Sequence, residues 1–87
     1  MKIKDGFVVR KIAGQYMAVP VGARTKAIHG MIALNETGAF IWNLLSTEQT
    51  ENDLVDAILN EYDVDREHAT ISVKRFLEKM EREDLLI

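Results

Sequence analysis

The sequence of 87 residues contains no cysteine and no long apolar run. Without cysteine the chain can form neither a disulfide framework nor a thiolate zinc site, and it has no cysteine nucleophile. No apolar run approaches the roughly 18 residues of a membrane-spanning helix. The N-terminal residues MKIKDG have no apolar segment after their charges, so we expect no secretory signal peptide. These absences predict a protein of the reducing cytoplasm.

Catalytic and cofactor-binding motifs are also missing. His29 and His68 are the only histidines, and a metal site would need a third ligand that no spacing supplies. Phosphate-binding glycine loops are absent, and Ser46 and Ser72 lie in no nucleophile motif. We therefore expect no enzymatic activity, no bound metal and no cofactor.

Charge divides the chain into a basic front and an acidic back. Residues 1–34 carry six basic side chains and one acidic one, whereas residues 35–87 carry five basic and thirteen acidic ones. Their net charges are therefore +5 and −8. Each part can be an ordinary solvated surface, or the basic front can meet an acidic partner. The total of −3 argues against broad nucleic-acid binding.

The first third of the chain has the pattern of an antiparallel sheet. Residues 7–12 and 15–21 are β-branched, partly alternating runs, which predict two strands. Ala13-Gly14 between them supplies a turn, because Gly14 can take positive φ. Pro20 lacks an N–H group, so pairing on one side should stop there.

A third strand is predicted over residues 31–34, at the edge of the sheet, with a start as early as Ile28 left open. Alternation along a strand turns successive side chains to opposite faces. The inward pair is Ile32 and Leu34, and the outward pair is Met31 and Ala33.

Residues 35–46 predict the first helix. Asn35 is a good N-cap, and Glu36 suits the positive end of the helix dipole. Gly38 has no side chain, so another backbone could approach closely there. The following residues up to Leu45 are almost all apolar and include Trp42, so we expect this helix to be buried with packing on two sides.

Two further helices follow, over about 51–62 and 66–83. Thr50 and Asp53 have the spacing of a capping box at the start of the second helix. Each helix has one apolar stripe at helical spacing. The stripes are Leu54, Val55, Ile58 and Leu59, and then Ala69, Val73, Phe76, Leu77 and Met80. The apolar residues 85–87 must pack or pair.

The predicted order is thus β-β-β-α-α-α, a single α+β domain over residues 1–87. It is similar to a winged helix-turn-helix in which a three-stranded antiparallel sheet precedes three helices. With 47% hydrophobic residues, the chain can bury one core.

Two surfaces of this predicted fold could bind a partner. The free side of the third strand can accept an added strand from a peptide or from another copy of the chain. The third helix has an off-stripe face with Ile71, Arg75, Lys79 and Arg82, which could form the wall of a groove beside that strand. The alternative is an ordinary solvated surface.

Three segments together resemble the PqqD-like family, named after pyrroloquinoline quinone biosynthesis protein D. They are FVVRKIAGQYMAVPVG, LNETGAFIWNLL and VKRFLEKMEREDLLI. The most specific part is an LNxxGxxIW core, met here by Leu34, Asn35, Gly38, Ile41 and Trp42. The resemblance covers nearly the whole chain and describes the fold more than the partner.

The resemblance implies a precursor-peptide recognition element. Such a protein binds the leader segment of a ribosomally made precursor peptide and delivers it to a modifying enzyme, commonly a radical S-adenosylmethionine protein. We expect a free-standing chain, which the family allows. In the family the leader adds as a strand to the third strand, against the third helix. The implied peptide-binding residues here are His29, Gly30, Met31, Ile32, Ala33, Leu34, Ile71, Arg75, Lys79 and Arg82.

The residues alone leave two other functions open. The first is DNA binding by a winged helix: the basic residues of the third helix favour it, and four glutamates on the same predicted helix oppose it because they would repel phosphates. The second is homodimerisation through the edge of the third strand.

Overall fold

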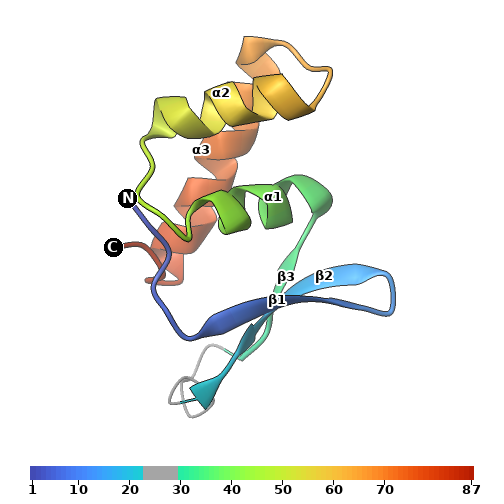
Figure 1. Cartoon of the computed structure of the whole chain (residues 1–87), viewed down its shortest axis with the longest axis vertical. Coiled ribbons are helices and arrows are strands. Elements are labelled where there is room, and N and C mark those ends of the chain that lie inside the picture. The colour runs from blue at the N-terminus through green and yellow to red at the C-terminus, as the bar shows by residue number, and fades with distance from the viewer. Residues whose placement is uncertain (23–29) are drawn as a thin grey trace.

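The computed structural model describes residues 1–22 and 30–87, and its three strands precede its three helices. Their order confirms the predicted α+β arrangement (Figure 1). The strands form one antiparallel sheet in the order β1-β2-β3. The elements are β1 (Phe7–Ile12), β2 (Gln15–Pro20), β3 (Ile32–Leu34), α1 (Glu36–Leu44), α2 (Glu51–Glu61) and α3 (Arg66–Arg82).

A two-residue turn joins β1 to β2. Gly14 has a φ of 81°, as predicted, and Ala13 also lies in the left-handed region with a φ of 51°. Two successive positive φ values define the hairpin turn whose twist matches that of the flanking strands. Only Gly14 could be assigned this conformation from its residue type, because alanine pays a steric cost of about 1 kcal/mol for it. β2 ends at Pro20, one residue before the predicted end.

β3 is short and, among residues 1–22 and 30–87, pairs with β2 alone, so it is the predicted edge strand. It begins at Ile32, one residue later than predicted. The predicted alternation is confirmed: Ile32 and Leu34 are 6% and 5% exposed, whereas Met31 is 57% exposed.

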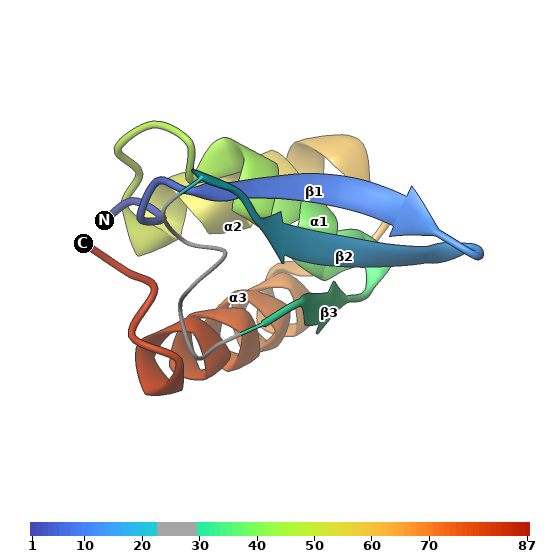
Figure 2. The same cartoon turned by 90° about the horizontal axis from the view of Figure 1, so that it is seen from below.

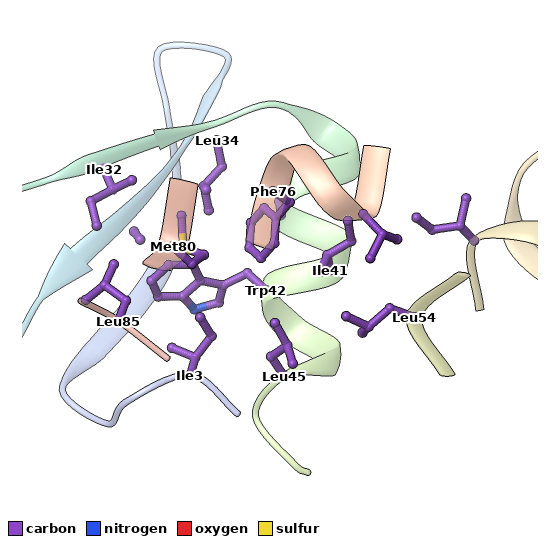
Figure 3. Close-up of a cluster of buried hydrophobic side chains, with 14 of the residues drawn as sticks. Ile3, Ile32, Leu34, Ile41, Trp42, Leu45, Leu54, Phe76, Met80 and Leu85 are labelled. Atoms are coloured by element: carbon purple, nitrogen blue, oxygen red, sulfur yellow. The ribbon is translucent and has the colours of Figure 1, made fainter. Parts of the chain in front are cut away.

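α1 directly follows β3 and carries the centre of the core. The Asn35 side chain accepts a hydrogen bond from the Gly38 N–H at 2.7 Å, which confirms the predicted N-cap. Figure 3 shows Trp42 among side chains from β3, α3 and both terminal segments. Its ring also meets Phe7 of β1 edge-on, with ring centroids 5.7 Å apart.

The expectation that α1 is buried nearly all round was too broad. Asn43 is exposed and Phe40 only partly buried, because one side of the helix turns away from the core. The Phe40 ring lies edge-on to Tyr62, just after α2. The prediction for Gly38 was also wrong in one respect: a side chain, Phe76, approaches it instead of another backbone.

α2 and α3 pack against each other, each with its predicted apolar stripe toward the core. The capping box of α2 is confirmed: the Thr50 hydroxyl accepts from the Asp53 N–H at 3.1 Å, and the Asp53 carboxylate accepts from the Thr50 N–H at 2.9 Å. Both helices end one residue before their predicted ends.

The two terminal segments lie side by side (Figure 1). Ile3 and Leu86 form an antiparallel bridge, and the Ile87 N–H donates to the Lys2 carbonyl at 2.8 Å. Leu85 is fully buried. The prediction that the apolar tail must pack or pair is therefore confirmed on both counts.

Within residues 1–22 and 30–87, no helix has both the length and the apolar character needed to cross a membrane.

Candidate functional site

A hollow of about 260 Å³ lies between the edge strand and the last helix. We call it the β3–α3 cleft. Figure 2 shows β3 with β2 on one side and α3 on the other. The volume is below the roughly 300–1,000 Å³ of small-molecule sites, so it suits one or two side chains of an extended segment. Its lining residues are Ala33, Leu34, Asn35, Thr37, Gly38, Ile41, Ser72, Arg75, Phe76 and Lys79.

The register of the sheet decides which way the backbone of Ala33 points. The hairpin turn makes Ile12–Gln15 a hydrogen-bonded pair, so by alternation Arg10–Met17 is one as well. The backbone groups of Met17 are therefore directed at β1. Ala33 is the β3 partner of Met17, so its own N–H and C=O point away from β2. These two groups form an open pairing position at the edge.

Lys79 of α3 reaches this edge. Its ammonium group donates a hydrogen bond of 2.8 Å to the Ala33 carbonyl, across 46 residues of sequence. Because α3 lies on the side of β3 away from β2 (Figure 2), this contact agrees with the outward direction that the register gives. It links the two walls of the β3–α3 cleft.

The floor of the cleft is apolar and depends on Gly38. Phe76 is 7% exposed and Ile41 fully buried. A Cβ at position 38 would lie 3.0 Å from the Asn35 carboxamide oxygen and 3.5 Å from the Phe76 ring. Glycine thus keeps both the N-cap bond and the floor free of an added methyl group.

The charge in the cleft is positive. Arg75 and Lys79 both line it, and Arg75 has no ion pair among the described residues. The acidic residue of α1, Glu36, does not line the cleft. It lines a second hollow, next to Tyr16. An occupant with carboxylate side chains therefore fits the cleft better than a basic one.

The other cations of α3 are spread around the helix and are partly neutralised. Arg66 pairs with Asp56 at 2.8 Å, and Lys74 with Glu51 at 3.4 Å. Three glutamates share the same helix, and Glu83 directly follows it. A phosphate backbone would meet no continuous basic face here, so the DNA-binding alternative is not favoured.

The structure brings together only some of the predicted site residues. Ala33, Leu34, Arg75 and Lys79 line the cleft. The side chain of Ile32 is buried in the core, and its backbone pairs with Ala18 of β2. Gly30 and Met31 are exposed just before β3, and Ile71 and Arg82 are exposed on α3 outside the lining. His29 lies outside the described residues.

Sequence reasoning missed the contributions of α1 and of Ser72 and Phe76. At 100° per residue about the axis of α3, Ser72 and Lys79 lie roughly 80–100° from the centre of the core stripe. Ile71 and Arg82 lie roughly 150–180° from it. The helix residues that face a neighbouring strand edge lie at the border of the apolar core stripe. Ser72 could have been predicted from its position at this border. The first turn of α1 has no such signal, because its position depends on the docking of α3.

His68 has a local structural role. Its backbone N–H donates to the Asp65 carboxylate at 2.8 Å, and its ring nitrogen lies 2.7 Å from the same oxygen. These two contacts, the backbone one first, hold the pKa of Asp65 below its usual value. Over the part of the chain that the structure describes, no group of three or more candidate ligands could hold a metal ion.

Comparisons with known proteins identify the family and the fold. Residues 23–86 match the family model described as "Coenzyme PQQ synthesis protein D (PqqD)". A comparison with curated proteins found no significant match.

Two solved structures have a similar fold. One is TbiB1 in complex with the TbiA(beta) leader peptide, with a TM-score of 0.74 and 29% identity over 99% of this chain and 94% of that one. The other is lasso peptide synthetase B1 complexed with the leader peptide, with a TM-score of 0.71 and 15% identity over 97% and 93%. At that identity the second likeness concerns the fold alone.

Proposed function

The chain belongs to the PqqD family, and from this membership we propose that it binds the leader segment of a ribosomally made precursor peptide. The leader adds as a strand to β3 and is presented to a modifying enzyme. The domain acts by binding and not by catalysis.

The observation that carries this proposal is the outward backbone of Ala33 beside an apolar, positively charged cleft. An added strand gains main-chain hydrogen bonds from β3, and its alternate side chains enter the cleft against α3. TbiB1, which shares 29% identity with this chain, is described in complex with a leader peptide, which supports the same class of ligand here.

The finer assignments belong to the same proposal. The peptide contacts are the segment 29–34, where Ala33 offers its outward backbone, and the α3 side chains Ile71, Arg75, Lys79 and Arg82, joined by Ser72 and Phe76 of the cleft. The modifying enzyme is of the radical S-adenosylmethionine type, as is common in the family. The site of action is the cytoplasm.

A backbone amide NMR titration tests the proposal. The probe is the leader of the precursor peptide encoded beside this chain's gene. We expect its addition to shift the amide signals of residues 30–34 and of α3, and to leave those of α2 in place. If a saturating amount of that leader leaves the β3 and α3 signals unmoved, the proposal is wrong.

A further inference from the structure

The hydrogen bond between Lys79 and the Ala33 carbonyl has a consequence for ligand choice. We propose that Lys79 covers the open edge of β3 in the free protein and selects leader peptides that carry a carboxylate next to the residue paired with Ala33. This inference rests on the proposed function and names the chemistry of its ligand.

The first step is competition for one oxygen atom. The Lys79 ammonium donates to the Ala33 carbonyl at 2.8 Å. This carbonyl belongs to the outward pair of backbone groups on β3, so a strand added there directs its own N–H at the same oxygen. Binding therefore replaces or weakens the Lys79 hydrogen bond. A bare edge strand is open to any extended chain, and a charged side chain across it is a known means of protection.

The second step is the fate of the released ammonium group. Lys79 is partly buried at the margin of the cleft, next to Arg75. Once a peptide covers the edge, the ammonium loses both its acceptor and part of its water. A carboxylate would restore a hydrogen bond of the stronger, charge-assisted kind. A basic or apolar residue at the same place would leave the ammonium without an acceptor.

The third step fixes the position of that carboxylate. In an antiparallel pair, directly opposed residues point to the same face. The peptide residue opposite Ala33 therefore points to the outer face of the sheet, as Ala33 does. The residues before and after it lie opposite Ile32 and Leu34, so their side chains point into the cleft, where Lys79 lies. The acidic residue is thus one of these two.

Selection from a displayed library of random peptides tests this inference. The library is panned in parallel on the wild type, on Lys79→Met and on Lys74→Met. Lys74 is the matched control: it lies on the same helix and loses the same charge, but it pairs with Glu51 instead of β3. Arg75 is unchanged in all three proteins, so a difference between the two variants belongs to Lys79.

We expect the wild type and Lys74→Met to enrich peptides with Asp or Glu at a cleft-facing position, and Lys79→Met to enrich them much less. Changing that Glu to Gln in one selected peptide should weaken its binding about tenfold to the wild type. The same change should have little effect on Lys79→Met.

The remaining outcomes separate this inference from the proposed function. If peptides shift the β3 and α3 amide signals but have the same acidic content on all three proteins, Lys79 does not select the ligand, and the proposed function stands. If no selected peptide shifts those signals, this inference is contradicted, and the proposed function is decided by the titration with the leader itself.

Discussion

Trp42 is the side chain on which most of the core depends. It is 6% exposed, and residues of β1, β3, α3 and both terminal segments surround it (Figure 3). We predict that Trp42→Ala lowers the free energy of unfolding by roughly 3–5 kcal/mol, because it removes a large apolar ring and leaves a cavity. Urea denaturation followed by circular dichroism measures this loss.

The control for this change is Trp42→Phe, which keeps an aromatic ring in the site and should cost less. A domain of this size has few kcal/mol to lose, so the alanine variant can be partly unfolded in water. Equal losses for the two variants would contradict the central position of Trp42.

At the residue scale, local contacts could be predicted from the sequence and distant ones could not. Asn35, Thr50 and Asp53 act within one helical turn, so their types and spacing were enough. The contact of Lys79 with Ala33 joins residues 46 positions apart. It depends on how α3 docks beside β3, which no local pattern contains.

At the scale of the elements, the N-terminus of α3 predicts a pH dependence. The Asp65 carboxylate caps this helix, and its hydrogen bonds to the N–H and ring of His68 hold its pKa below the usual value. A lowered pKa in the folded state stabilises the protein above the unfolded pKa of about 3.9, and this contribution is lost as the pH falls below it. Asp53, which caps α2, shifts in the same direction.

We therefore predict that the free energy of unfolding falls with acidification below about pH 4. Asp65→Asn keeps a good cap but removes the titrating group, so its stability should depend less steeply on pH, and adding Asp53→Asn should flatten the curve further. Urea denaturation at a series of pH values measures the slope. A double variant as steep as the wild type would show that other carboxylates dominate.

β3 allows a test that spares the rest of the sheet. Because the Ala33 N–H points away from β2, Ala33→Pro removes an outward donor without breaking the β2–β3 ladder, and proline is tolerated at such edge positions. We predict that this variant folds and binds the leader peptide at least about tenfold more weakly. The edge hydrogen bond from the Ala33 N–H is lost, and the proline ring occupies the place where the added strand would approach.

The matched control is Ala33→Val, which keeps the N–H and adds apolar atoms only on the exposed outer face. It should bind nearly as well as the wild type. Fluorescence anisotropy with a labelled leader measures both affinities. Undiminished binding by the folded proline variant would mean that the peptide does not pair with β3 at this position.

At the scale of the whole molecule, the covered edge bears on self-association. An open strand edge favours pairing with a second copy, and the sequence left a dimer through β3 possible. With only three residues in β3 and the Ala33 carbonyl bonded to Lys79, we predict a monomer at all accessible concentrations. Light scattering over a concentration series measures the mass, and a dimer whose amide shifts map to β3 would contradict this.

The order of elements and the core could be predicted from the sequence because the helices have apolar residues at helical spacing and N-cap residues, and the first two strands are β-branched and partly alternating. The limits of β3 were less certain, since three residues give almost no alternation. The sequence predicted that the apolar tail must pack or pair, but it did not identify Ile3 as the partner of Leu86. The partner of the tail depends on the tertiary packing that brings the two ends of the chain together.

If a leader peptide adds to β3 as a strand, hydrogen exchange at the Ala33 amide must slow when the peptide binds. In the free protein the Ala33 N–H faces away from β2, so it should exchange quickly, whereas the N–H groups of Ile32 and Leu34 already pair with β2. At saturation with the leader, we predict that exchange at Ala33 slows strongly, while that of its two neighbours changes little. Unchanged exchange at Ala33 in a fully bound complex would contradict strand addition.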